Sequence, residues 1–426
     1  MRKSEFDAAA AQGVAASAEV THRIHRAAWS FSVRRVPVTA AQGLIRGPCT
    51  PRAGDLVLAV VDSLGQHPGL QLPSGRRKQL FAGDEIVVAY GNRYASNQFE
   101  AIVPETLGPC HLAAGGGIAG RVVAWHVKMS KGPTQLTPVG LLCDGDGKRI
   151  NVADHALAPI QVIDGPFPPA IAVVGTGMDS GKTQTCAYIV RGLRAAGLRV
   201  GYGKVTGTGA GGDTWMLTDA GASPVLDFTD AGMATTYLAS PEDVEHTLVN
   251  IMGHLAMAGV DAMVLEIADG VLQRETAALL RSAAFQSLVT GVVMASQDSM
   301  GATAGVQWLR RYVGRNALAV SGLISAAPLQ AREATTQLGL PVYDRAGLAT
   351  PENAMDLLRR ARQQFERAQS KNHRKVRGER HEPHRVIQTA EAAGAGQAAG
   401  LAAPWSLGAP DAQLRSDHGV RDLHAT

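Results

Sequence analysis

Apolar and polar residues follow one pattern before residue 165 and another after it. Residues 36–165 contain short apolar runs typical of strands, separated by turn signals such as Ala-Gly-Asp and Asp-Gly-Asp-Gly. This pattern predicts a small β-rich domain, either a barrel or a sandwich. Its predicted strands contain the runs DLVLAVV, EIVVAYG, FEAIVP, GRVVAWHV and PVGLLC.

After residue 165, apolar strand-like runs alternate with segments whose apolar residues have helical spacing. This alternation predicts an α/β fold, in which helices cover both faces of a mainly parallel, doubly wound sheet. Ligands of such sheets bind at the carboxyl ends of the strands. The predicted strands are 171–174, 198–205, 261–267, 287–295 and 317–325, and the predicted helices lie near 182, 240–257, 274, 303 and 330.

The chain of 426 residues is long enough for two domains with tails. We expect the Ala-rich N-terminus to be disordered or loosely helical, and the Ala-, Gly- and Pro-rich C-terminus to be disordered. The three prolines of IDGPFPPA indicate a linker near residue 165. The predicted segments are the extension 1–35, the β-rich domain 36–165, the α/β domain 166–368 and the tail 369–426.

Composition and charge narrow the function classes. No stretch approaches the roughly 20 apolar residues of a membrane span. Glu5 and Asp7 stand where a signal peptide would begin its apolar core, so we expect a cytoplasmic protein without membrane partners. Much of the formal charge of +4 comes from residues 370–385. No aromatic residues interleave there, which favours a solvated tail over a nucleic-acid contact.

Other reactive residues predict little chemistry. The histidines form neither HxH nor HExxH, which disfavours a histidine-built metal site, and no Ser-His-Asp triad can be assembled from spacing. Four polar residues gather between two predicted strands and could face a partner or a substrate, although turn residues are the favoured interpretation and we assign them no role: Asn92, Arg93, Tyr94 and Glu100. The cysteines are widely spaced without a CxxC pair, which favours reduced thiols: Cys49, Cys110, Cys143 and Cys186.

The run IAVVGTGMDSGKTQT predicts a nucleotide-phosphate site, because a strand leads into a glycine-rich loop and then a helix. The glycines let backbone amides converge on phosphate oxygens at the helix N-terminus. Lys182 would neutralise the β- and γ-phosphates, and the Thr183 hydroxyl would bind Mg²⁺. The predicted phosphate-binding residues are Gly175, Thr176, Gly177, Met178, Asp179, Ser180, Gly181, Lys182, Thr183 and Gln184.

The loop GTGMDSGKT is one residue longer than the commonest form and resembles the loop of dethiobiotin synthetases and their relatives among P-loop ATPases. The resemblance covers roughly residues 170–345 and implies a P-loop NTPase sheet that binds ATP and Mg²⁺. It also implies γ-phosphate transfer to a small carboxylate-like or carbamate-like acceptor, a reaction that depends on positioning and charge neutralisation. Where the family has a base-reading asparagine, this chain has GLISAAP with Ser325.

Three downstream charges extend the resemblance. In that family a lysine like Lys204 ends the second strand and contacts substrate and phosphate, although its following proline is Val205 here. Asp213 corresponds to a family aspartate that helps to bind Mg²⁺, and as a residue that opens a helix it also fits a simple helix cap. Glu266 ends a buried strand, where a carboxylate is costly without a cation, and Asp269 is a second candidate. The resemblance thus implies Lys182 and Lys204 as catalytic residues and Thr183, Asp213 and Glu266 as metal ligands.

Two glycine runs fit GxGxxG. Residues 207–212, GTGAGG, follow the second strand of the α/β part, and we interpret them as a flexible substrate loop because the preceding turn carries a more specific phosphate motif. Residues 115–120, GGGIAG, precede a strand-like run and indicate a tight turn.

Three functions fit these motifs. The favoured one is an ATP-dependent ligase or kinase acting on a small molecule. The second is an NTP-driven regulatory or cofactor-maturation protein whose β-rich domain docks a partner. The third is a P-loop acyltransferase that uses coenzyme A, resembling D-amino-acid N-acetyltransferases. Thr176, Gly177 and Met178 replace the early lysine of the switch-type ATPases, which disfavours a dimer switch, although a homodimer is left open.

Overall fold

The computed structural model describes residues 13–160 and 167–378. The predicted boundary near residue 165 and the tail beyond residue 378 lie outside these residues. Contacts divide the chain into the units Met1–Arg374 and Lys375–Thr426. All elements below belong to the first unit, except the end of the last helix. The mixed α/β class with a parallel sheet is confirmed, while the four predicted segments stay predictions.

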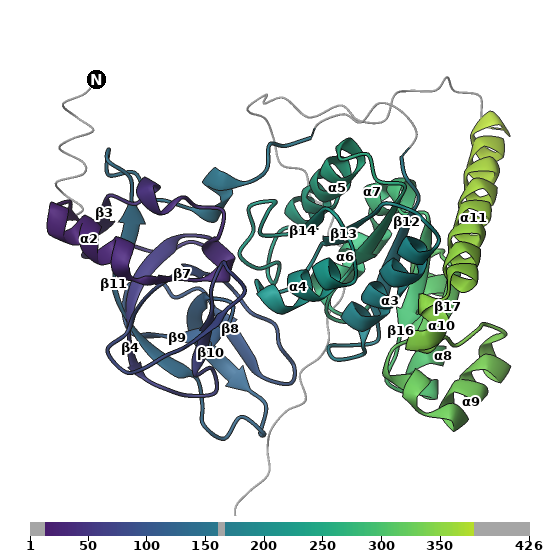
Figure 1. Ribbon diagram of the computed structural model, residues 1–426, viewed down its shortest axis with the longest axis horizontal. Helices are drawn as coiled ribbons and strands as arrows, with labels where there is room; N and C mark the ends of the chain where they lie inside the picture. Colours follow the sequence, from purple (N-terminus) through teal and green to yellow (C-terminus); the bar gives the residue numbers. More distant parts are fainter. Residues whose placement is uncertain (1–12, 161–166, 379–426) are drawn as a thin grey trace, which may run out of the picture. The chain divides into compact units, whose positions relative to one another are not determined.

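The parallel sheet has six strands in the order β14-β13-β15-β12-β16-β17 (Figure 1). Strand β12 lies between β15 and β16, with Ala172 opposite Leu265 and Val292. Its residues are all buried, as are those of β15, β16 and β17, which explains their continuous apolar runs. The bounds are β12 Ala170–Gly175, β13 Val200–Lys204, β14 Val225–Asp227, β15 Ala262–Glu266, β16 Gly291–Ala295 and β17 Ala317–Ser321.

Helices cover both faces of this sheet (Figure 1). Helices α5 to α9 pack their apolar residues on one face, and α3, α4, α10 and α11 pack on the other. The bounds are α3 Lys182–Ala195, α4 Gly211–Asp219, α5 Pro241–Met257, α6 Arg274–Arg281, α7 Ala283–Leu288, α8 Ser299–Trp308, η4 Leu309–Val313, η5 Leu323–Ala326, α9 Pro328–Leu338, α10 Arg345–Ala349 and α11 Pro351–Gly378.

The largest differences from the predicted elements are at three ends. The strand expected over 317–325 ends at Ser321, and the turn η5 follows it. The strand expected over 287–295 begins only at Gly291, because Ser282 caps the helix α7 by accepting a hydrogen bond from the Phe285 amide. Helix α11 continues to Gly378, ten residues into the predicted tail 369–426.

The N-terminal part forms a nine-stranded sheet in the order β1-β3-β11-β4-β7-β10-β8, with β2 and β9 branching from it. Strand β9 pairs with both β10 and β11, so the pairings β11–β4–β7–β10–β9 close into a ring. Apolar clusters that include Leu58 and Tyr90 fill it. The bounds are β3 Gly43–Ile45, β4 Leu56–Ser63, β7 Glu85–Tyr90, β8 Phe99–Ile102, β9 Cys110–Ala114, β10 Ile118–Trp125, β11 Thr134–Cys143, and the separate hairpin β5 Gly69–Gln71 with β6 Arg77–Gln79.

Residues 13–35, which we expected as part of an extension, are joined to this sheet. The short strands β1 and β2 pair with β3 and β7. Between them, Ser17 caps α2 by accepting a hydrogen bond from the Val20 amide. The bounds are β1 Val14–Ala15, α2 Ala18–Arg26, β2 Ala28–Trp29, η1 Phe31–Val33, η2 Val38–Ala40 and, further along the chain, η3 Val152–His155.

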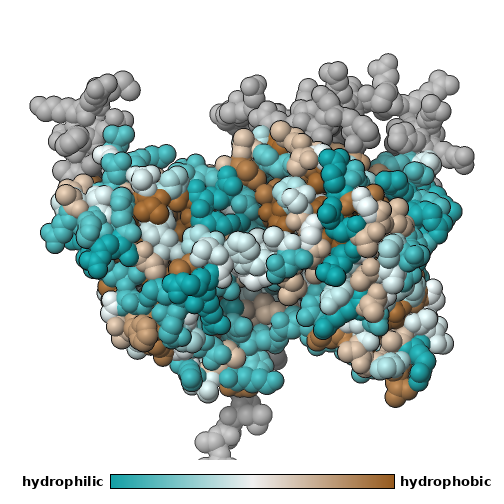
Figure 2. Space-filling view, viewed as in Figure 1, coloured by the Kyte–Doolittle hydropathy of each residue, from teal (hydrophilic) through white to brown (hydrophobic). Residues whose placement is uncertain are grey.

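The visible surface mixes hydrophilic residues with small, separate hydrophobic patches (Figure 2). Across the described ranges 13–160 and 167–378, no helix combines the length and the apolar character needed to cross a membrane.

Candidate functional site

The glycine-rich loop between β12 and α3 keeps its hydrogen-bond donors unused. Within the described residues, the backbone N–H groups of residues 177–181 donate to no protein acceptor. The Ser180 hydroxyl is buried and also has no partner. A side chain added at Gly177 would meet nothing within 4 Å. The loop therefore offers unpartnered donors and open space at a helix N-terminus, as an anion site requires.

Lys182 lies across this loop. Its ammonium donates to the carbonyl of Gly177 at 2.8 Å and to that of Asp269 at 2.7 Å, and the residue is only 6% exposed. Burial lowers the pKa of Lys182, and the charges of Glu266 and Asp269 oppose this shift. The predicted phosphate lysine is thus held at the loop by carbonyl groups and bears no direct ion pair.

Two loop residues adopt left-handed backbone conformations that are uncommon outside glycine. Asp179 has φ 60° within the phosphate loop, and Asp269 has φ 64° after β15. Burial raises the pKa of the Asp269 carboxyl to about 6, although Lys182 opposes the shift. Gly181, at φ 92°, packs so closely that an added Cβ would lie 2.9 Å from the Cα of Gly322. Strained residues of this kind gather at functional sites.

The predicted Lys204, Asp213 and Glu266 come together with Thr183. Lys204 forms a close ion pair with Asp213, and its Nζ lies 3.6 Å from Oε1 of Glu266. Lys204 and Glu266 are register partners of β13 and β15, so the sheet itself holds them opposite one another. Burial acts to lower the pKa of Lys204, but the two carboxylates outweigh it and raise this pKa well above its usual value. Lys204 also lowers the pKa of Asp213, against the effect of burial.

The buried carboxylate of Glu266 has hydrogen-bond donors and a cation of this chain beside it. It accepts hydrogen bonds from the Tyr202 hydroxyl at 2.9 Å and from the Thr183 hydroxyl at 3.2 Å. With Lys204 as the nearby cation, the burial of Glu266 does not by itself require a metal ion. Strand register places Lys204 opposite this carboxylate, a neighbour that the sequence-based prediction of a metal ion at Glu266 did not include.

The same oxygens fit Mg²⁺, which takes few protein ligands and prefers hydroxyl and carboxylate oxygens. Thr183, Asp213 and Glu266 supply such oxygens beside the unused amides of the loop. Over residues 13–160 and 167–378, no three His, Cys, Asp or Glu side chains form a metal-binding group. The arrangement suits an ion that keeps most of its water or phosphate ligands.

A cavity of about 340 Å³ opens beside the start of α3. Gly181 and Gln184 line it from the loop and helix, and Ser325 lines it from the segment after β17. Asp344, which caps α10 by accepting from the Gly347 amide at 2.7 Å, closes another side. The structure thus brings the predicted Gln184 and Ser325 to one cavity that adjoins the phosphate loop.

Sequence reasoning missed contacts that reach the phosphate loop from distant segments. Asn97, before β8, donates to the Asp179 carboxylate at 2.6 Å, and Gln297 donates to the Met178 carbonyl at 3.2 Å. The neighbouring Arg93, which we had left without a function, is buried with an unpartnered Nε. The polar cluster of residues 92–100 was the available signal, but no spacing rule connects it with a loop some eighty residues later.

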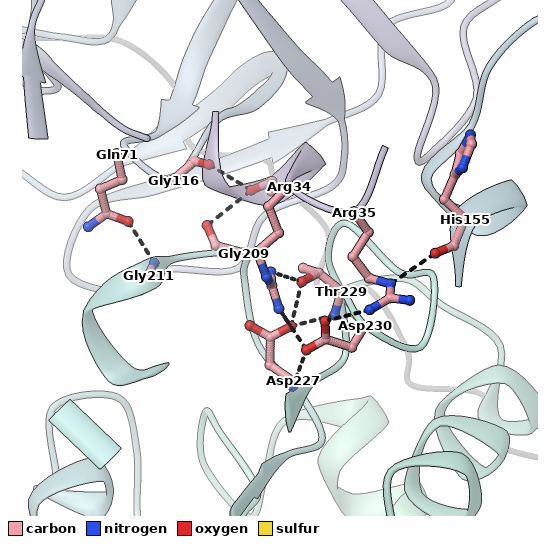
Figure 3. A network of polar contacts seen from close by, with 11 residues as sticks. Arg34, Arg35, Gln71, Gly116, His155, Gly209, Gly211, Asp227, Thr229 and Asp230 are labelled. Carbon is pink, nitrogen blue, oxygen red and sulfur yellow. Dashed lines mark hydrogen bonds and ion pairs between the residues drawn. The ribbon is translucent and has the colours of Figure 1, made fainter. Parts of the chain in front are cut away.

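The N-terminal part also binds the end of β14 and the segment that follows it (Figure 3). The Arg34 guanidinium lies 2.9 Å from Oδ1 of Asp227 and 2.7 Å from Oδ2 of Asp230. Arg35 lies 3.5 Å from Asp230 and donates to the His155 carbonyl at 2.9 Å. Although burial acts to lower the pKa of Arg34, both carboxylates raise it above its usual value. These paired, poorly exposed charges hold the segment in one position.

No protein-family model matches this chain, and no curated protein matches it. Among solved structures, it is similar to the signal recognition particle receptor FtsY from Elizabethkingia anophelis, with 20% identity, a TM-score of 0.32 and coverage of 42% of this chain and 57% of that one. It is also similar to a DUF1611 family protein from Anabaena variabilis, with 15% identity, a TM-score of 0.31 and coverage of 46% of this chain and 58% of that one. A third similar structure is the signal recognition particle 54 kDa protein from Aeropyrum pernix, in complex with GDP. It has 18% identity, a TM-score of 0.30 and coverage of 47% of this chain and 50% of that one.

Each of these three likenesses spans less than two thirds of the other protein. TM-scores this low do not establish a relationship between this chain and those proteins. The fold and the site define this chain instead as a parallel α/β protein whose central strand leads into a P-loop-type turn.

Proposed function

We propose that this protein is a Mg²⁺-dependent, nucleoside-triphosphate-using enzyme of the synthetase or kinase type, which transfers a phosphoryl group to a small carboxylate-like acceptor. One observation carries the proposal: the unused amides of residues 177–181 lie beside Lys182 and the hydroxyl of Thr183 at the start of α3. Donors, a cation and a metal-binding oxygen are the three components that a triphosphate site requires.

The roles follow from the chemistry of each group. The loop amides and Lys182 would hold phosphate oxygens, and Lys204 would neutralise charge that develops during transfer. Thr183, Asp213 and Glu266 would hold Mg²⁺, which bridges phosphate oxygens and offsets their charge. Lys204 already contacts both carboxylates, so it would share them with the ion.

The cavity lined by Gln184 and Ser325 suits the nucleoside, because it adjoins the loop and has room for a base. ATP is the triphosphate that the resemblance to dethiobiotin synthetases implies. We further propose that residues 36–165 act as a β-rich domain that contributes to the same site, supported by the contact of Asn97 with Asp179.

The test compares Lys182→Ala with Arg191→Ala, which removes a cation from an exposed position of the same helix. We expect Lys182→Ala to weaken Mg²⁺–ATP binding by roughly a hundredfold, since a buried charge contact is lost. Arg191→Ala should bind as the wild type does. Calorimetric titration measures the affinities, and thermal unfolding verifies that both variants fold. Unchanged ATP and GTP affinity in Lys182→Ala would refute the proposal.

Ligand-dependent melting separates the proposal from the coenzyme A alternative. A triphosphate enzyme should melt at higher temperature with Mg²⁺ and ATP than with EDTA and ATP, because ligands that bind only the folded state stabilise it. Stabilisation by acetyl coenzyme A alone, independent of Mg²⁺, would favour the acyltransferase instead. Colorimetric assay of phosphate release across pools of small carboxylic and amino acids would then identify the acceptor.

A further inference from the structure

Helix α4, which carries Asp213 in its first turn, begins without a cap of its own. Its N-cap residue is Ala210, which provides no side-chain hydrogen bond. The missing acceptor comes from β5: Oε1 of Gln71 accepts from the Gly211 amide at 2.7 Å, across 140 positions of sequence (Figure 3). An acceptor here satisfies one of the free amides that every helix start leaves.

The hairpin of β5 and β6 holds α4 at a second point. Gly75, at its turn, lies so near the Trp215 indole that an added Cβ would come within 2.8 Å of the ring. The backbone N–H of Gln71 donates to the Gly115 carbonyl at 2.8 Å, which fixes the backbone of Gln71 to the turn before β10. Gln71 therefore has a defined backbone position from which its side chain reaches the helix.

The loop that precedes α4 is held by the same turn. The Ser32 hydroxyl donates to the Gly116 carbonyl at 2.8 Å and lies 3.4 Å from the Gly209 carbonyl. A Cβ on Gly116 would stand only 1.9 Å from the Gly209 oxygen, so the two backbones are in direct contact. The expectation that residues 207–212 form a flexible loop is at odds with these contacts.

We infer that Gln71 is a positioning residue for the magnesium side of the site: by capping α4, it holds Asp213 against Lys204 and thereby sets how well the site accepts Mg²⁺. The inference rests on the proposed function. Among the described residues, no hydrogen bond joins Gln71 to Lys204 or Asp213, so it would act through the helix. The N-terminal part would then contribute to the affinity for the metal–nucleotide complex while leaving the phosphate loop itself unchanged.

The test uses the full chain and three variants. Gln71→Met keeps the length of the side chain but has no acceptor, whereas Gln71→Glu keeps an acceptor oxygen. Gln79→Met changes an exposed glutamine on the partner strand of the same hairpin and serves as the matched control. For each protein, affinities for ATP and for GTP are measured with Mg²⁺ and with EDTA, and the ratio gives the gain due to magnesium. Thermal unfolding is recorded in parallel.

We expect Gln71→Met to reduce the magnesium-dependent gain about fivefold, the factor that a lost helix cap typically makes, with little change in EDTA. Gln71→Glu and Gln79→Met should keep the wild-type gain. An unchanged gain in Gln71→Met overturns the inference, as does an equal loss with and without Mg²⁺, since that indicates general damage to the fold. A wild-type protein that binds neither nucleotide overturns the proposed function, and the inference with it.

Discussion

Two glycine-rich loops leave β12 and β13, the strands on either side of β15 in the parallel sheet, and they use their backbone amides in opposite ways. In the loop after β12, the amides of residues 177–181 have no protein acceptor among the described residues. In the loop after β13, Gly207 donates to the Thr236 hydroxyl at 2.8 Å and Gly209 to the Ala234 carbonyl at 3.1 Å. The amides of the first loop remain available, whereas Gly207 and Gly209 of the second loop are hydrogen-bonded within the protein.

The difference teaches that glycine content alone does not identify a ligand loop. Small residues allow a backbone to approach phosphate oxygens, but they equally allow it to approach another backbone, as Gly116 and Gly209 do here. What distinguishes the two loops is the fate of each amide, together with the lysine and threonine that follow only the first.

The largest effect is expected from one added methyl group. Gly116→Ala would place a Cβ at 1.9 Å from the Gly209 carbonyl oxygen, so a backbone must shift, and we expect a loss of about 3 kcal/mol in the free energy of unfolding. Gly177→Ala adds the same group in open space and should change stability by less than about 0.5 kcal/mol. Urea unfolding measures both. Equal losses would contradict the proposed contrast between the loops.

A smaller, pH-dependent effect is expected at Asp269, whose carbonyl accepts from Lys182. Its carboxyl pKa is raised from 3.8 to about 6, so the folded protein holds this proton to higher pH than the unfolded chain does. The carboxyl therefore contributes stability below about pH 4 that is lost as the pH rises through about 6. Between pH 4 and pH 8, wild-type stability should fall by roughly 2 kcal/mol relative to Asp269→Asn.

Urea unfolding of both proteins at several pH values checks this prediction. Asparagine tolerates the left-handed backbone at this position, so the substitution adds no backbone strain of its own. Asp219→Asn, at an exposed position of α4, is the control and should follow the wild-type curve. A constant difference between Asp269→Asn and wild type from pH 4 to pH 8 would speak against the buried carboxyl.

The smallest effect is expected from Gly212→Ala. This exposed glycine is the second residue of α4, and an added Cβ would meet nothing within 4 Å. Because alanine loses less conformational entropy in a helix than glycine does, we expect a gain of about 0.5–1 kcal/mol in stability. Thermal unfolding measures the gain. A loss of stability instead would show that the loop of residues 207–212 needs glycine at this position too.

The sequence predicted those elements of the fold that are marked by their own residues. The apolar runs of β12, β15 and β17 and the sequence GKT at the start of α3 identify strand, loop and helix without knowledge of any partner. Lys204 and Glu266 were each assigned to the site through the resemblance, whereas their position opposite one another on β13 and β15 emerged only from the structure. The roles assigned to these residues stay predictions.

Long-range contacts left no such signal. Gln71 and Asn97 look like ordinary residues of a hairpin and a turn, and only the folded chain brings them to Gly211 and Asp179. The sequence did not reveal that Lys204 offsets the buried charge of Glu266, and the reason is related. Strand register decides which side chains face each other, and register is a property of two segments, whereas apolar periodicity belongs to one.

The cap of α4 also has a consequence for the order in which the chain folds during its synthesis. Gln71 leaves the ribosome 140 residues before Gly211. At about 5–20 residues per second, the hairpin waits on the order of ten seconds for its helix. The ring of strands that carries it can close during this interval, whereas Asp213 and Lys204 acquire their final environment only after two distant parts of the nascent chain have met.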